Sequence, residues 1–253
     1  MDSYTVYTPV NEILNILLER ISLIIGNQFV GFYLFGSLAL NDFVPDRSDI
    51  DIVVTTKTIL AEDQLEELQQ MHKELIENKV PYSDRMECIY IPIDSLRNYV
   101  KEKSYFPCLH NGGEFYRDGF GLLEKHVLRE RGVILKGPDP KSFMKSVSLS
   151  ELQKAARESL TNWWLPKLNN STSLADDDYQ TFAILTMCRA LYTIEKGNIV
   201  SKSEAAIYAK TEAEEYSSLI EEALAWKIGG TFNKLQQTLD FMKFTFHRVG
   251  IGT

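Results

Sequence analysis

The sequence predicts a mixed-sheet α+β domain over residues 1–148, followed by an all-helical bundle over residues 149–253. Segments with helical and strand periodicity alternate through the first part, which is typical of a sheet covered by helices. From Leu149 onward the apolar residues recur at helical spacing alone. The run Gly137–Pro140 is the strongest group of helix and strand breakers in the chain, and it lies shortly before the predicted boundary.

Apolar spacing in the first domain predicts helices and strands with one unassigned stretch between them. The predicted helices are Pro9–Gly26, Leu60–Asn78 and Leu122–Arg131, and the predicted strands are Phe29–Phe35, 48–54, Arg85–Ile91 and Val133–Leu135. In the stretch between them, Phe106-Pro107 and Asn111–Gly113 predict loops.

The second domain is predicted to hold helices separated by short polar segments. These helices are Glu151–Leu165, Phe182–Glu195, one near Glu212–Trp226 and Thr231–His247. Lys167–Ala175 is predicted as a polar loop. Ser201–Glu204 matches a capping box, in which a hydroxyl and a glutamate satisfy the free N–H groups that begin the next helix.

The composition predicts a soluble cytoplasmic protein that acts without nucleic acid or membrane. The formal net charge is -8 and the pI is about 5.2, whereas a general nucleic-acid binder normally carries a basic footprint. No stretch reaches the roughly 18 apolar residues that span a bilayer. The cysteines Cys88, Cys108 and Cys188 form no close pair, which favours reduced thiols. Nothing in the chain requires more than a monomer.

An acid pair follows a glycine-serine turn in the first domain. Asp49 and Asp51 alternate with apolar residues, so both carboxylates point to one face of the predicted strand. Carboxylate oxygens are ligands that suit Mg²⁺. The Gly36-Ser37 turn offers backbone N–H groups and a hydroxyl that can hold a phosphate. Taken alone, such an acid pair is more often a solvated strand face.

A lone acid on a later strand strengthens the metal hypothesis. Glu87 shares a face with Ile89 and Ile91, so it interrupts an otherwise apolar row. In an α/β arrangement, Glu87 can lie beside Asp49 and Asp51 on a neighbouring strand. Three carboxylates and a phosphate-binding turn favour metal-assisted chemistry on a nucleoside triphosphate.

These elements resemble the nucleotidyltransferase superfamily that includes DNA polymerase beta and the antibiotic nucleotidyltransferases. Its members carry a Gly-Ser turn, an acid pair separated by one apolar residue and often a third acid downstream. In the second domain, Leu185–Thr193, Gly197 and Ser201-Lys202 are similar to the helical domain of bacterial aminoglycoside adenylyltransferases. That group modifies streptomycin at its 3'' position and spectinomycin at its 9 position.

The resemblance implies a Mg²⁺-dependent adenylyltransferase that confers antibiotic resistance. AMP would move from ATP to a hydroxyl of streptomycin, spectinomycin or both, with release of pyrophosphate. Residues 1–148 would be the nucleotidyltransferase domain, and residues 149–253 would contribute to nucleotide and aminoglycoside binding in a cleft between the two. The implied ligands of two Mg²⁺ ions are Asp49, Asp51 and Glu87, and the implied nucleotide contacts are Gly36, Ser37 and Ser48. Glu87 would also be the catalytic base, ionised at neutral pH because nearby metal ions lower the pKa of a carboxylate.

The resemblance also assigns roles in the second domain, each with a structural alternative. Arg189 and Lys202 match residues that reach the nucleotide, although each can instead be a solvated or ion-paired surface cation. Trp164 and Asp178 match residues that contact the drug, by stacking and by charge. Their alternatives are a core tryptophan and an acid at a helix start.

Two alternatives to the antibiotic acceptor stay open. A nucleotidyltransferase of the toxin–antitoxin kind would use a protein or nucleic acid, and it would need a basic or aromatic acceptor groove. A non-catalytic binding homologue would be favoured by the loss of a carboxylate. All three carboxylates, Asp49, Asp51 and Glu87, are present.

Overall fold

The computed structural model describes residues 2–110 and 114–252, which form two compact units. The N-terminal unit comprises residues Met1–Phe43 and Ser48–Ser146. The helical unit comprises Val147–Thr253 together with the short segment Val44–Arg47.

The N-terminal unit is built on a mixed sheet, as predicted. Within the described residues the sheet has six strands in the order β5-β4-β3-β2-β1-β6. Strands β2 and β3 run parallel, and the other neighbouring pairs are antiparallel. The strands are β1 (Phe29–Leu34), β2 (Ile50–Thr56), β3 (Met86–Pro92), β4 (Tyr105–His110), β5 (Glu114–Gly119) and β6 (Val133–Lys136).

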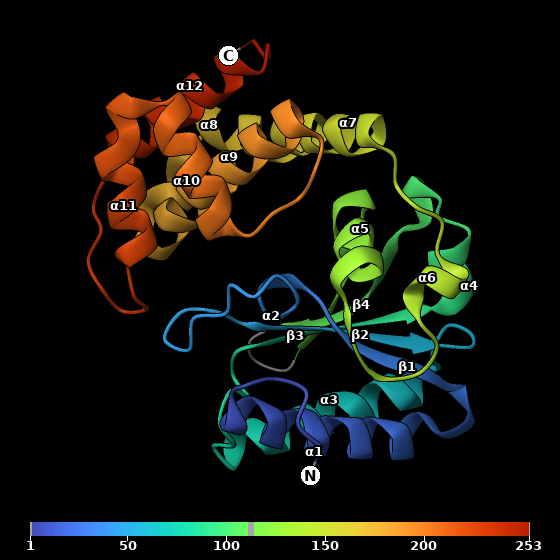
Figure 1. The fold of residues 1–253 in the computed structure, drawn as a ribbon. Coiled ribbons are helices and arrows are strands. Elements are labelled where there is room, and N and C mark those ends of the chain that lie inside the picture. The colour runs from blue at the N-terminus through green and yellow to red at the C-terminus, as the bar shows by residue number, and fades with distance from the viewer. Residues whose placement is uncertain (1, 111–113, 253) are drawn as a thin grey trace. The chain divides into compact units, whose positions relative to one another are not determined.

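Two long helices cover one face of this sheet (Figure 1). Helices α1 (Thr8–Ile25) and α3 (Glu62–Glu77) pack their apolar stripes against the inward side chains of β1, β2 and β3. Ile50, Ile52 and Val54 belong to that buried core, which leaves the carboxylate of Asp51 on the opposite face. The opposite face carries α5 (Leu122–Arg131) and the short helix α2 (Gly36–Ala39), which contact each other. The remaining short helices of this unit are α4 (Ile93–Arg97) and α6 (Pro140–Phe143).

The sequence-based prediction missed β4 and β5. Phe106-Pro107, predicted as a loop, lies inside β4, and the predicted loop Asn111–Gly113 lies outside the described residues. Proline is compatible with this strand because β3 pairs with β4 only through Cys108–His110, beyond the proline. A proline that predicts a loop from sequence is therefore tolerated in the part of β4 that is not paired with β3.

In the helical unit, α9 is the central element. It contacts α7, α10, α11 and α12, and a π-helical turn at Leu160–Trp164 joins α7 to α8. Helix α9 begins five residues before the predicted start at Phe182, and α8 and a 3-10 turn occupy most of the predicted loop Lys167–Ala175. The helices are α7 (Leu149–Ser159), α8 (Leu165–Asn169), α9 (Asp177–Lys196), α10 (Lys202–Glu212), α11 (Ser217–Ala225) and α12 (Leu235–Arg248).

Two predicted helix ends are confirmed. Gly197 ends α9 in the left-handed conformation, with φ of 68°. Ser201 caps α10, because its hydroxyl accepts a hydrogen bond from the backbone N–H of Glu204 at 3.1 Å, which confirms the serine half of the predicted capping box.

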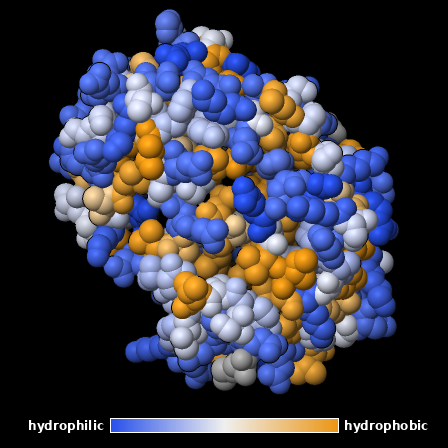
Figure 2. All heavy atoms as spheres, viewed as in Figure 1, coloured by the Kyte–Doolittle hydropathy of each residue, from blue (hydrophilic) through white to orange (hydrophobic). Residues whose placement is uncertain are grey.

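The helices of the described chain are all too short or too polar to pass through a lipid bilayer. Figure 2 shows polar residues over much of the viewed surface, with apolar residues in small groups among them. Such scattered apolar groups are ordinary on a protein surface.

Candidate functional site

The Gly36-Ser37 turn lies directly against Asp51. The backbone N–H of Phe35 donates to the carbonyl of Asp51 at 3.1 Å, so the turn that ends β1 is held beside β2. Gly36 has a φ of 58°, and a Cβ atom there would lie 1.8 Å from Oδ2 of Asp51. Glycine is needed at this position because the carboxylate occupies the space that a side chain would take.

Ser37 holds a buried polar atom with no partner. Its Oγ is buried and makes no hydrogen bond within the described residues. An unsatisfied buried hydroxyl costs about 1–3 kcal/mol, so a ligand at this point is a physical explanation for it. A phosphate oxygen fits, because it accepts a hydrogen bond from a hydroxyl group.

The structure brings Asp51 and Glu87 together on neighbouring strands. These residues are direct partners in the parallel register of β2 and β3, and neighbouring strands lie about 4.8 Å apart. Asp49 lies one residue before β2. Two or three carboxylates on one sheet face repel each other, and oxygen donors of this kind suit a Mg²⁺ ion. The residues present therefore fit the implied metal.

Arg85, which the sequence analysis missed, supports the start of β2. Its Nε lies 3.8 Å from Oδ1 of Asp49, and its Nη2 donates to the carbonyl of Ser48. Arg85 also lies over the ring of Tyr82, 5.4 Å from the centroid. A cation directly before β3 thus holds Ser48 and Asp49 near the ends of both strands. The sequence predicts Arg85 only as the first residue of a strand.

Glu87 has a raised pKa in the chain without metal. Burial is the main cause, and the negative charges of Asp51, Asp118, Glu124 and Asp49 add to it, raising the pKa of Glu87 to about 8. The sequence analysis expected an ionised Glu87 because of nearby metal ions. The metal-free chain instead favours the protonated form at neutral pH.

Two further residues that the sequence analysis missed lie beside Glu87. The ligand atoms of Glu87, Cys108 and Asp118 all lie within 4.8 Å of one another. Cys108 is the register partner of Ile89, and Asp118 is the partner of Phe106 on the same sheet face. Finding them required β4 and β5, because Cys108 and Asp118 come beside Glu87 only through the pairing of these strands with β3 and with each other.

The predicted nucleotide contacts of the helical unit lie on α9 and α10. Lys202 is the first residue of α10, and its Nζ lies 4.7 Å from the centroid of the Phe182 ring. Arg189 follows Phe182 by seven residues, so both lie on one side of α9. Arg189 is partly exposed. The roles of Arg189 and Lys202 toward a nucleotide stay predictions.

The structure argues against Trp164 as a stacking ring. Trp164 is 2% exposed, and its ring packs against Tyr179 and Phe182, so it belongs to the core of the helical unit. Trp163 is 57% exposed instead, and Nζ of Lys167 lies 3.4 Å from its ring centroid. Consecutive helical residues point to different sides, so only packing decides which tryptophan is buried.

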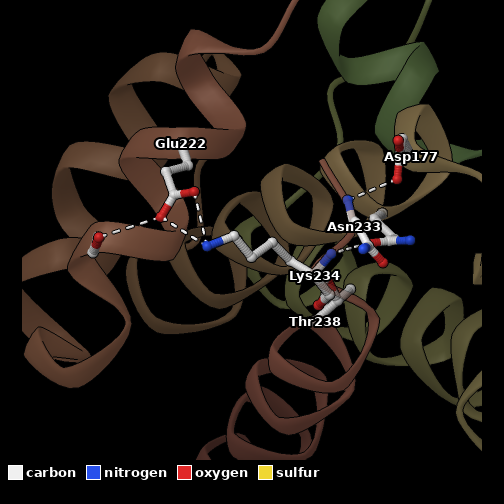
Figure 3. A network of polar contacts seen from close by, with 7 residues as sticks. Asp177, Glu222, Asn233, Lys234 and Thr238 are labelled. Carbon is white, nitrogen blue, oxygen red and sulfur yellow. Dashed lines mark hydrogen bonds and ion pairs between the residues drawn. The ribbon is translucent and has the colours of Figure 1, made fainter. Parts of the chain in front are cut away.

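The acids at the start of α9 divide between structural and exposed positions. Oδ1 of Asp177 accepts from the backbone N–H of Asn233 at 2.7 Å, which anchors the segment before α12 (Figure 3). The backbone N–H groups of Phe232 and Asn233 hold the pKa of Asp177 below its usual value. Lys234 continues the network through an ion pair with Glu222 at 3.0 Å. Asp178 is exposed, and its drug-facing role stays a prediction.

Two family models match the chain in sequence order. The model described as a nucleotidyltransferase domain matches residues 10–106. The model described as the C-terminal domain of aminoglycoside adenylyltransferase matches residues 143–249. The first match contains Gly36, Ser37, Asp49, Asp51 and Glu87, whereas Cys108 and Asp118 lie beyond its end. The second contains α7 to α12.

Curated relatives and a solved structure extend this likeness. A spectinomycin 9-adenylyltransferase of Staphylococcus aureus is 29% identical over 198 residues, covering 73% of this chain and 72% of the relative. One of Campylobacter jejuni is 26% identical over 215 residues, covering 78% and 75%. The crystal structure of a spectinomycin adenylyltransferase from Enterococcus faecialis, with ATP and spectinomycin, covers 94% of this chain and 98% of its own. Its TM-score of 0.73 at 17% identity shows a common fold.

Proposed function

Because the chain belongs to the bacterial aminoglycoside adenylyltransferase family, within the DNA polymerase beta-like nucleotidyltransferase superfamily, we propose that it transfers AMP from ATP to a hydroxyl group of spectinomycin. The observation that carries the proposal is the packing of Gly36 against the Asp51 carboxylate, beside the unsatisfied hydroxyl of Ser37. A buried hydroxyl next to paired carboxylates suits a triphosphate with its metal ion. Antibiotic resistance is the biological consequence of the proposed activity.

Spectinomycin is the proposed acceptor because of the relatives. The Staphylococcus aureus and Campylobacter jejuni proteins are both spectinomycin 9-adenylyltransferases, and they align with 73% and 78% of this chain. The net charge of -8 also suits a cationic acceptor. Streptomycin is the second acceptor to test.

Glu87 is the proposed general base. The antibiotic hydroxyl oxygen forms a bond to the α-phosphorus of ATP, the bond from that phosphorus to the bridging oxygen breaks, and pyrophosphate leaves. The proton of the hydroxyl passes to an oxygen of Glu87, which must be ionised to accept it. Asp49, Asp51 and Glu87 would hold Mg²⁺, which would supply positive charge against the phosphates when bound.

The remaining predicted residues are proposed to bind the substrates. Ser37 and Ser48 would hold phosphate oxygens through their hydroxyl groups, and the backbone of Gly36 allows close approach. Arg189 and Lys202 are proposed to contact the nucleotide from the helical unit, because a phosphate attracts both cations. Asp178, which is exposed at the start of α9, is proposed to face the antibiotic.

Pyrophosphate release tests this function directly. Purified protein is incubated with ATP and Mg²⁺, and spectinomycin and streptomycin are added in separate reactions. We expect turnover with spectinomycin and a product whose mass equals antibiotic plus AMP minus water. Glu87→Gln is expected to lower turnover about 10²- to 10⁴-fold while nucleotide binding is retained. Folded protein that binds ATP but turns over neither antibiotic would rule out the proposed activity.

A further inference from the structure

Asp118 carries a carboxylate next to the proposed base. It lies in β5, and its carboxylate oxygen is within 4.8 Å of the ligand atoms of Glu87 and Cys108. Its orientation is constrained on both oxygens. The backbone N–H of Gly119 donates to Oδ1 at 2.7 Å, and the hydroxyl of Tyr116 donates to Oδ2 at 3.4 Å.

Within residues 2–110 and 114–252, neither Asp118 nor Glu87 forms an ion pair with a lysine, arginine or histidine. Among the described residues, no basic side chain therefore neutralises the charge of Asp118. The buried thiol of Cys108 adds no positive charge, and burial together with the neighbouring acids raises its pKa, so it stays protonated. Two carboxylates this close attract a cation between or beside them.

Asp118 is not among the residues proposed above to bind Mg²⁺. Asp51 lies on β2, and Glu87 lies on β3 between β2 and β4. Asp118 lies two strands farther, on the side of Glu87 away from Asp51. A cation bound by Asp118 is therefore expected on the side of Glu87 opposite the nucleotide phosphates.

We propose that Asp118 binds the protonated amino group next to the hydroxyl that is adenylylated, and so selects an aminocyclitol acceptor. This inference rests on the proposed function. In an aminocyclitol, amino and hydroxyl groups stand on adjacent carbons of one ring, and the amines are protonated at neutral pH. A hydroxyl that gives its proton to Glu87 therefore places an ammonium group one carbon away. Asp118 supplies the negative partner at that position.

Kinetics of Asp118→Asn test the proposal, because the amide keeps the shape and removes the charge. We expect the KM for spectinomycin to rise about 10- to 100-fold, since hydrogen bonds to charged groups contribute on that scale. The KM for ATP is expected to stay unchanged. Asp118→Glu is expected to recover part of the affinity. The matched control is Glu66→Gln, which removes one exposed charge from α3 on the helix-covered side of the same unit.

A second measurement uses the wild-type protein and does not depend on the folding of a variant. Spectinomycin acylated on the amine beside the reactive hydroxyl is neutral there, and the wild type is expected to discriminate against it. Asp118→Asn is expected to lose most of that discrimination, because the variant lacks the charge that attracts the free amine. If Asp118 served folding alone, the variant would change the KM for both acceptors by the same factor.

Three outcomes separate the possibilities. An unchanged KM for spectinomycin in Asp118→Asn, with normal wild-type turnover, overturns the role of Asp118 and leaves the proposed function intact. A fall in kcat with unchanged KM also overturns it, because Asp118 would then act on Glu87 and not on the acceptor. Wild-type protein without spectinomycin turnover overturns the proposed function, and the proposed recognition with it.

Discussion

At the scale of single residues, Gly36 decides whether the turn and Asp51 can coexist. Gly36→Ala would place a Cβ atom 1.8 Å from the carboxylate oxygen, so β2 or the turn must shift. We expect a marked loss of Mg²⁺-ATP binding, measured by calorimetry, together with a lower melting temperature. Gly26→Ala is the matched control, because Gly26 has a φ of 50° but an added Cβ there meets nothing within 4 Å. If Gly36→Ala and Gly26→Ala lowered Mg²⁺-ATP binding and the melting temperature equally, backbone strain alone would explain the effect of Gly36→Ala.

Glu87 makes the stability of the metal-free protein depend on pH. Its pKa is raised to about 8 in the folded chain, so the folded state keeps a proton that the unfolded state releases above the ordinary pKa of 4.5. The stabilisation that this proton gives is complete below pH 4.5 and is lost as the pH rises through about 8.

Thermal unfolding in EDTA tests this dependence with Glu87→Gln. The variant is expected to melt several degrees above wild type at pH 8 and close to it at pH 5, because the amide has no proton to lose. Saturating Mg²⁺ should reduce the difference, since a cation favours the ionised carboxylate of the wild type. Glu66→Gln, an exposed acid, should show no such pH trend. A constant difference across pH would contradict the raised pKa.

At the scale of elements, the start of α10 separates helix capping from ligand binding. The Ser201 hydroxyl caps the helix, whereas Lys202 points its ammonium group toward the Phe182 ring. Ser201→Ala is expected to destabilise the protein by about 1 kcal/mol, with little effect on the KM for ATP at a temperature where it is folded. Lys202→Ala is expected to raise the KM for ATP with little change in melting temperature. The reverse pattern would refute the nucleotide role of Lys202.

The elements also show which parts of the secondary structure local sequence patterns predict and which they do not. Helix α5 was predicted with the bounds observed, because its apolar spacing, first-turn acid and last-turn arginines agree. Strands β4 and β5 were missed, because β4 contains a proline and Glu114–Gly119 lacks the regular alternation that predicts a strand. Their strand character depends on pairing with β3 and with each other, which no window of sequence contains. Because β5 was not predicted, the sequence did not place Asp118 beside Glu87.

At the scale of the whole molecule, the net charge of -8 should assist a cationic acceptor. Raising the ionic strength from about 0.05 M to about 0.5 M shortens the Debye length and weakens the attraction between exposed charges. We therefore expect the KM for spectinomycin to rise severalfold in steady-state assays at fixed saturating Mg²⁺-ATP. The amine-acylated acceptor should respond less, because it carries less positive charge. A KM that is flat or falls with salt would exclude long-range attraction.

The sequence by itself determined which segments become β1, β2 and β3, and that Asp51 and Glu87 avoid the helix-covered core. Turn chemistry and side-chain alternation depend on near neighbours in the chain, so these features can be predicted from the sequence without the fold. Only the tertiary structure decided that Asp118 lies beside Glu87, and that Trp164 is buried while Trp163 is exposed. Strand pairing and helix packing join residues that are distant in sequence, so proximity and burial appear only when the chain is folded.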